Sequence, residues 1–418
     1  MRLSNAILVP AAAVLLLLSA AGFADSSTGR ATTAPKAYVG LFKDNAVAVL
    51  DTGNGQVLTR IPVPAGPHGI VITPDGRWVF VSSDGDSKVS VIDASRDEVA
   101  ASIEVGASPH GLAITPDGRL VLAAVFGAGA VAFIDTASRE VVASLPAGNP
   151  HNIAVSPDGS TAYVATQKPG ALGLTVLDIP SRSQVGFVPL DKTPRALSVS
   201  PDGKMLYFTL AGSDAVQVLD TARRLIVNQI PVGASPHLPL ATPDGKKVLV
   251  VSQGPGELYV LDAAAGSVSA HLAVGALPHW IALTPDGRKA LVTNEGSDDV
   301  AVVDLGTLTR TGTVQAGHAP RKVAIQPVGL PGVAASATTQ ISSFAFAPDL
   351  TIAPGQTLIW TNRDAVPHTV AADDGSWASG EIASGGSFGR AFEKPGTYAY
   401  HCTIHPFMRG SLTVKGLP

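Results

Sequence analysis

Short apolar runs recur through the middle of the chain, and turn-forming residues separate them. One unit of this pattern has apolar runs at Gly69–Ile72 and Trp78–Val81, an alternating run at Val89–Asp93 and a fourth run at Val99–Val105. Runs of this length, bounded by turns, are typical of β-strands. Each unit therefore predicts four consecutive strands.

The unit repeats along the chain, together with the turn between its first two strands. A Thr or Ser followed by Pro-Asp-Gly recurs at intervals of 41–44 residues, and a degenerate copy at Gln326–Gly329 ends the series. Pro sets the first corner of a tight turn, and Gly accepts the positive φ that other residues resist. The period is typical of a four-stranded propeller blade. The intact copies begin at Thr73, Thr115, Ser156, Ser200, Thr242 and Thr284.

The two ends of the repeat predict a closed ring. Ala37–Val63 holds the second to fourth strands of a blade, and Lys322–Gln326 is a first strand that nothing follows. Pairing them completes a seventh blade and removes the open sheet edges. Residues 36–327 are therefore predicted to form a seven-bladed β-propeller. An Asp that we interpret as a turn former ends the third strand of each blade: Asp51, Asp93, Asp135, Asp178, Asp220, Asp262 and Asp304.

The pattern changes after residues 328–338, a stretch rich in Gly, Pro, Ala and Ser that we interpret as a linker. Strand-like runs then appear around Phe344–Pro348, Ile352–Gln356 and Gly396–Tyr400. Their spacing is typical of a small Greek-key β-sandwich, predicted over residues 339–418. The expected fold class is all-β: a seven-bladed β-propeller followed by a β-sandwich.

The N-terminus has the features of a secretory signal peptide. A basic start at Met1-Arg2 precedes the apolar run Ala6–Leu18, and small residues lead to cleavage after Ala24. The run is too short for a membrane anchor, so residues 1–24 predict a periplasmic or secreted protein with no integral membrane segment after cleavage. A formal net charge of −4 without a basic cluster argues against nucleic acid as a partner.

Cys402 is the only cysteine of the 418 residues. Exported proteins mostly pair their cysteines in disulfides, so a single one suggests a free or metal-bound thiol. His405 and Met408 follow it at three-residue intervals, and His368 follows the strand-like run Thr357–Asn362. Two His, one Cys and a weak Met are the ligands of a type 1 copper site. Zinc is disfavoured because it prefers tetrahedral sites without a thioether.

Both predicted domains of the chain resemble known families. Residues 36–327 resemble the YVTN family of seven-bladed propellers, with phrases such as Thr161–Ala165 and Leu291–Asn294. Residues 339–418 resemble a cupredoxin of the amicyanin and pseudoazurin group, and the short ligand loop followed by Arg-Gly at 409–410 is amicyanin-like.

The cupredoxin resemblance implies a role for each ligand. Cys402 supplies the strong thiolate bond, and His368 completes the trigonal plane from inside the domain. His405 exposes one ring edge to solvent, framed by Pro406 and Phe407, and is the expected port for electrons.

Three residues near the expected copper ligands are predicted not to bind the metal themselves. Thr369 and Thr403 are placed to bridge the two ligand-bearing segments and so to tune the reduction potential. His401 precedes the cysteine on an extended strand, so its side chain is expected on the opposite face.

A second pattern lies in the propeller. A histidine or arginine stands immediately before the first strand of each blade, where equivalent residues are expected to form a ring at one mouth of the central channel. Inherited packing residues are one interpretation. The other is a site for a second copper or an anion, with His318 as a further member. The ring positions are His68, His110, His151, Arg195, His237, His279 and Arg321.

The pairing of a propeller with a cupredoxin resembles the architecture of nitrous oxide reductase. The cupredoxin of that family needs two cysteines, however, so nitrous oxide reduction is not expected here. Arg195 and Arg321 would suit a small anionic substrate such as nitrite, because guanidinium presents a planar fork of donors. A small sulfur compound is another candidate, and a noncovalent haem in the propeller stays open.

The favoured hypothesis is an exported electron-transfer protein with one type 1 copper per chain. Its propeller would be the docking platform for a periplasmic redox protein. One alternative is a copper-dependent oxidoreductase with a second metal or an anion at the histidine ring, so whether the protein is an enzyme is left open. The other is copper storage or delivery. A homo-oligomer would let the copper domain of one chain face the propeller of another.

Overall fold

The computed structural model describes residues 34–327, 337–347, 350–352, 356–392 and 394–415. These residues form strands and turns, and none of them lies in a helix that could span a membrane. The predicted signal peptide lies outside the described residues. So does most of the predicted linker, whose last two residues already belong to strand β29 (Ala337–Ser342).

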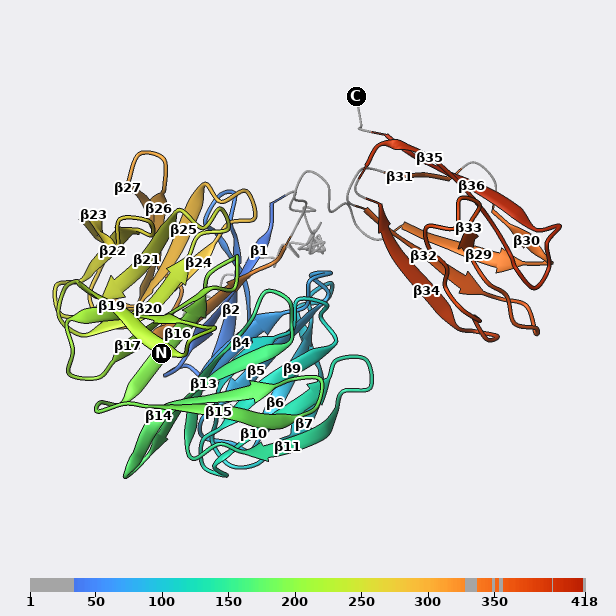
Figure 1. Cartoon of the computed structure of the whole chain (residues 1–418). Helices are drawn as coiled ribbons and strands as arrows, with labels where there is room; N and C mark the ends of the chain where they lie inside the picture. Colours follow the sequence, from blue (N-terminus) through green and yellow to red (C-terminus); the bar gives the residue numbers. More distant parts are fainter. Residues whose placement is uncertain (1–33, 328–336, 348–349, 353–355, 393, 416–418) are drawn as a thin grey trace, which may run out of the picture. The chain divides into compact units, whose positions relative to one another are not determined.

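The first part of the chain folds into seven four-stranded antiparallel sheets, the blades of a β-propeller (Figure 1). Six blades use consecutive strands, and the seventh has the order β28-β1-β2-β3. This confirms the predicted fold class. The strands are β1 (Lys36–Leu41), β2 (Ala46–Asp51), β3 (Val57–Pro62), β4 (Pro67–Ile72), β5 (Trp78–Ser83), β6 (Lys88–Asp93), β7 (Glu98–Glu104), β8 (Pro109–Ile114), β9 (Leu120–Val125), β10 (Ala130–Asp135), β11 (Glu140–Pro146), β12 (Pro150–Val155), β13 (Thr161–Lys168), β14 (Ala171–Asp178), β15 (Ser183–Pro189), β16 (Pro194–Val199), β17 (Met205–Leu210), β18 (Ala215–Asp220), β19 (Leu225–Pro231), β20 (Pro236–Ala241), β21 (Lys247–Ser252), β22 (Glu257–Asp262), β23 (Ser267–Ala273), β24 (Pro278–Leu283), β25 (Lys289–Asn294), β26 (Asp299–Asp304), β27 (Thr309–Val314) and β28 (Pro320–Ile325).

The seventh blade joins the two ends of the ring. Strand β28 pairs antiparallel with β1, with Tyr38 opposite Ala324. The Tyr38 hydroxyl donates a hydrogen bond to Asp97 of the neighbouring blade at 2.7 Å, and the Lys36 ammonium lies 2.7 Å from the same carboxylate. The closing blade is thereby tied to the blade that follows it, and each first strand contacts the first strand of the next blade around the ring.

The recurring turn residues explain why the strands begin and end where they do. In the first copy, the Thr73 hydroxyl bonds to the Asp75 carboxylate and accepts the N–H of Trp78, while Gly76 has a φ of 70°. The Asp135 carboxylate accepts the N–H groups of Ala137 and Ser138, in the turn that follows β10, at 3.0 and 2.8 Å. Side-chain to backbone bonds of this kind stabilise turns, which confirms the turn-forming role of the repeated Asp residues.

The second part of the chain is a sandwich of two four-stranded sheets (Figure 1). Their strand orders are β30-β29-β32-β34 and β31-β36-β35-β33. Large apolar side chains fill the space between the sheets, with Trp360 and Tyr400 fully buried, and Cys402 and Met408 belong to the same core. The remaining strands are β30 (Ala345–Phe346), β31 (Leu350–Ile352), β32 (Gln356–Asn362), β33 (Ala371–Ala372), β34 (Ser387–Phe392), β35 (Gly396–His401) and β36 (Arg409–Val414).

Candidate metal centre

His368 is held by the turn that follows β32. The Asn362 amide at the end of that strand donates to the carbonyl oxygens of Val366 and Ile382 at 2.8 and 2.9 Å. The backbone of His368 also forms a β-bridge with Ile382. These bonds place the imidazole in the core, where it is fully buried.

Cys402, His405 and Met408 lie on the loop between β35 and β36. These two strands pair antiparallel up to His401 and Arg409, so the seven residues between them must turn back tightly. The N–H of Cys402 donates to the carbonyl of Met408 at 3.1 Å, and the N–H of Met408 donates to that of His405 at 2.9 Å. The loop therefore closes on itself with its three donor side chains near one another.

The donor atoms have the geometry of a trigonal metal site. The Cys402 Sγ lies 3.9 Å from His368 Nδ1 and 3.8 Å from His405 Nδ1, and the two Nδ1 atoms are 3.2 Å apart. A point in their plane is about 2.1 Å from all three, close to the range of roughly 2.0–2.3 Å for metal–nitrogen and metal–sulfur bonds. Met408, 2% exposed, supplies a thioether from the same loop.

The partners of each donor favour metal binding. His368 Nε2 lies 2.9 Å from the Asp364 carboxylate, so Nε2 carries the proton and Nδ1 keeps its lone pair. The Thr369 N–H donates to Cys402 Sγ at 3.3 Å. Burial alone would raise the pKa of Cys402, but hydrogen bonds to its sulfur, the backbone N–H of Thr369 foremost, outweigh burial and lower this pKa to about 6. The thiolate, which is the form that binds metal, is therefore favoured at neutral pH.

The two threonines connect the ligand-bearing segments as expected. Thr369 Oγ1 lies 2.9 Å from Thr403 Oγ1 and accepts the N–H of Thr403 at 2.7 Å. His401, in contrast, bonds to Asp373 at 2.6 Å and is not one of the converging donors. The sequence did not indicate that Phe344 belongs to the metal centre. Its ring nevertheless packs edge-on against the rings of His368 and His405.

The propeller ring divides into histidines that meet and arginines that have other partners. Arg195 donates to Ser235 at 3.1 Å, and Arg321 pairs with Glu295 at 2.9 Å. His318, the proposed extra member, is exposed and bonds to Asp44 at 2.7 Å. Burial is the main cause that lowers the pKa of each of the five ring histidines, so their rings are neutral at pH 7. They are His68, His110, His151, His237 and His279.

Lys322 is a buried cation of the ring region that sequence reasoning missed. Its ammonium donates to the Asn152 side chain at 2.6 Å and lies 4.0 Å from the centre of the Trp280 ring. Burial lowers the pKa of Lys322 to about 7. The available signal was a lysine in the apolar first strand of the last blade, at a position next to the ring residue.

Replacement of Lys322 by methionine is expected to change how propeller stability depends on pH. An unfolded lysine has a pKa of about 10.4, so between pH 7 and 10 the unfolded wild type binds a proton that the folded state has lost. The free energy of unfolding of the wild type should therefore rise relative to Lys322→Met by about 3 kcal/mol between pH 7.0 and 9.5. Denaturant unfolding of both metal-free proteins at the two pH values measures this difference. A constant difference would show that Lys322 titrates normally.

The fold and the donor set define the C-terminal domain as a type 1 copper domain. Residues 333–415 match the family model "Copper binding proteins, plastocyanin/azurin family". Amicyanin-alpha from Methylorubrum extorquens is 34% identical over 88 residues, which cover 20% of this chain and 74% of the relative. The chain belongs to this copper-binding family through its C-terminal domain.

Amicyanin from Paracoccus denitrificans is 41% identical over 75 residues, or 16% of this chain. The chain spans 56% of the length of that relative. In the propeller, residues 38–189 match the family model "Cytochrome D1 heme domain".

Solved structures share the propeller fold. A hydrazine synthase chain from Kuenenia stuttgartiensis superimposes with a TM-score of 0.59 at 22% identity, covering 64% of this chain and 91% of that one. A protein of unknown function from Desulfotomaculum acetoxidans gives a TM-score of 0.59 at 17% identity, covering 69% and 98%. At these identities the likeness concerns the fold alone.

Proposed function

We propose that this protein is an exported electron carrier that exchanges single electrons with a redox protein through His405. The observation that supports this most is the position of His405, with one ring nitrogen among the buried donors and the ring only partly covered. Type 1 copper supplies a one-electron Cu(II)/Cu(I) couple at such a site. An electron that enters through the His405 ring therefore has a short path to the thiolate of Cys402.

An apolar rim around His405 suits brief contact with a partner. Phe407 is 72% exposed, and Phe344, Ile404 and Val366 are also exposed. Exposed aromatic side chains supply contact area with little loss of conformational entropy, and electron-transfer encounters bury small interfaces. The partner we propose is a redox protein with a complementary apolar surface beside its own cofactor.

The donors are held in place by the protein itself. Asp364 fixes the His368 ring, and Thr369 bonds both to Cys402 Sγ and to Thr403. Because these bonds do not depend on the ion, the donors need to move little between its two oxidation states. Small rearrangement favours electron transfer over storage and release of copper.

We propose that the propeller is a docking platform for the redox partner. Both proteins would meet in the periplasm or outside the cell, where the predicted signal peptide directs this chain. Its outer strand β19 is solvent-exposed, with apolar positions such as Leu225 and Val227. Part of the partner would contact this surface while the copper domain makes the electron-transfer contact.

Phe407→Lys is expected to slow electron self-exchange between copper-loaded molecules at least tenfold. When two such molecules meet through this surface, the two introduced lysines would face each other. Like charges brought together cost several kcal/mol, and about 1.4 kcal/mol is enough to lower the rate tenfold. Line broadening in NMR spectra of mixed oxidation states measures the rate. The visible spectrum and copper content should not change, because Phe407 is not a ligand.

The matched control is Phe187→Lys, which adds the same charge at an exposed phenylalanine on the propeller strand β15. It should leave self-exchange within about twofold of the wild type, since it adds no charge to the apolar rim around His405. Equal rates for Phe407→Lys and wild type would exclude this rim as the electron-transfer surface.

A further inference from the structure

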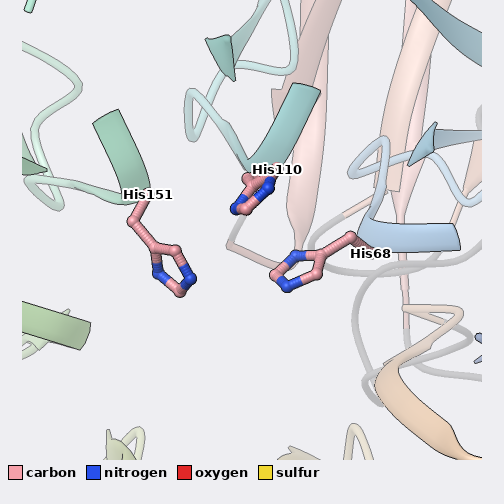
Figure 2. Close-up of side chains that lie close together, drawn as sticks. All are labelled: His68, His110 and His151. Atoms are coloured by element: carbon pink, nitrogen blue, oxygen red, sulfur yellow. The ribbon is translucent and has the colours of Figure 1, made fainter. Parts of the chain in front are cut away.

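Three histidines from consecutive blades converge inside the propeller. His68, His110 and His151 occupy the second position of β4, β8 and β12, and their rings face one another (Figure 2). The ring centroids of His68 and His110 are 4.7 Å apart, and those of His110 and His151 are 5.1 Å apart. One nitrogen from each ring lies within 4.8 Å of the other two.

His110 has the hydrogen-bond arrangement of a metal ligand. Its Nε2 lies 2.8 Å from the Asp84 carboxylate and so carries the proton. Its Nδ1 is then left with a lone pair, is buried and has no hydrogen-bond partner among the described residues. Metal-binding histidines commonly donate their second N–H to a carboxylate in this way.

His68 and His151 complete the set of donors. His68 is 4% exposed, and its Nδ1 is also buried without a hydrogen-bond partner among the described residues. His151 Nδ1 lies 3.0 Å from the side-chain amide nitrogen of Asn152 and 3.3 Å from the carbonyl oxygen of Arg195. Nε2 is therefore the nitrogen left for an ion, in the tautomer whose Nδ1 donates to the Arg195 carbonyl. Buried polar atoms without partners are rare in folded proteins, and a bound ion would account for them.

We propose that His68, His110 and His151 bind a copper ion in the propeller, separate from the type 1 site. Imidazole nitrogens suit copper and zinc, and among divalent first-row metals copper binds such sites most tightly. Nitrogens at most 4.8 Å apart lie within about 2.8 Å of a common centre. Side-chain rotations that move each nitrogen inward by less than about 1 Å would reach metal–nitrogen bonds of about 2.0–2.1 Å.

His237 and His279 lie on the same ring of strands and extend the site. Their ring centroids are 4.0 Å apart, and the ring of His279 is 6.3 Å from that of His68. His237 Nδ1 is also buried and without a partner among the described residues, and His279 Nδ1 lies 3.1 Å from the carbonyl oxygen of Arg321. Additional imidazole nitrogens are therefore available beside the three-histidine cluster.

The charges around the cluster favour an anion on the open side of the ion. Arg195 or Arg321 acts electrostatically on four of the five histidines, and Lys322 acts on all five in its protonated form. Among the residues that the structure describes, the carboxylate that bonds to the cluster is that of Asp84, through His110. Positive neighbours oppose a bare cation, so the copper would hold a small anionic ligand that reduces its net charge.

The experiment uses the full chain carrying Cys402→Ala, which removes the type 1 site, and titrates it with Cu(II) alone. We expect about one copper per chain, with the electron paramagnetic resonance signal of nitrogen ligation. Addition of His68→Ala or His110→Ala should weaken this binding at least tenfold. Asp84→Asn, which keeps every ligand, should weaken it by about 10- to 100-fold.

The matched control is His271→Ala in the same background, because His271 is an exposed histidine on the outer strand β23. Its copper content should equal that of Cys402→Ala alone. Circular dichroism and the thermal unfolding midpoint show whether each variant is folded. A Cys402→Ala chain that binds no copper would overturn the proposal, and so would equal copper binding by the folded His68→Ala and His271→Ala variants.

The outcome is separable from the electron-carrier proposal. His68→Ala with Cys402 intact should keep the blue colour and the self-exchange rate of the wild type. A colourless copper-loaded wild type would contradict the type 1 assignment. The copper content of Cys402→Ala would still test the propeller site, because that variant lacks the type 1 site.

Discussion

Replacement of Cys402 by serine is expected to abolish the blue colour and to lower the copper affinity of the C-terminal domain by at least about 100-fold, more than loss of a supporting hydrogen bond typically costs. The intense visible absorption of type 1 copper depends on its bond to a thiolate, which a serine hydroxyl cannot replace. The hydroxyl is a hard ligand that stays protonated at neutral pH, and it leaves only two imidazoles and a weak thioether. Visible spectra and copper affinity measured by competition with a chelator provide the test.

The control for this experiment is the adjacent residue. His401→Ala removes a histidine that bonds to Asp373 and lies outside the donor set, so its copper affinity and colour should match the wild type. If Cys402→Ser stayed blue, or if His401→Ala lost its copper, the assignment of the ligands would be wrong.

Trp360→Ala should cause the largest loss of stability among single substitutions in the copper domain. Trp360 is fully buried, and its ring centroid lies 5.3 Å from that of Tyr400 and 6.0 Å from that of Trp377. Truncation of a buried Phe or Trp to Ala costs about 3–5 kcal/mol, because apolar surface is lost and a cavity remains. Thermal or denaturant unfolding of the copper domain, followed by its near-ultraviolet signal, measures the change.

The effect should extend to the metal site. Tyr400 lies two residues before Cys402 on β35, so loosening the contact between Tyr400 and Trp360 should also weaken copper binding. Trp78→Ala is the control, since Trp78 is a partly exposed tryptophan of the propeller. It should leave unfolding of the copper domain unchanged. A loss below about 1 kcal/mol in Trp360→Ala would mean that the core collapses around the gap and fills the cavity.

Local patterns predicted much of the fold. Each Pro-Asp-Gly turn is short, and its hydrogen bonds connect residues two to five positions apart, as in Thr73–Trp78. Such bonds form within one segment, so the sequence shows them directly. The count of seven blades and the pairing of β28 with β1 followed from an incomplete unit at each end.

Long-range contacts were not predictable in the same way. Lys322 and Asn152 are 170 residues apart, yet they bond at 2.6 Å because first strands of different blades meet around one channel. Phe344 contacts two histidine rings of the metal centre from another part of the sandwich. Neither contact leaves a spacing or a motif in the sequence.

Residue patterns alone were enough to predict an all-β chain, blades that repeat and close, and one short loop that carries Cys402, His405 and Met408. Periodicity and turn chemistry act over a few residues, and ligands on one loop are close in any fold. Which ring positions meet depends on the tertiary structure, because equivalent positions in the seven blades have different neighbours. Arg321 pairs with Glu295, whereas His68, His110 and His151 converge, and a buried nitrogen on at least two of their rings lacks a hydrogen-bond partner in the part of the chain that the structure describes.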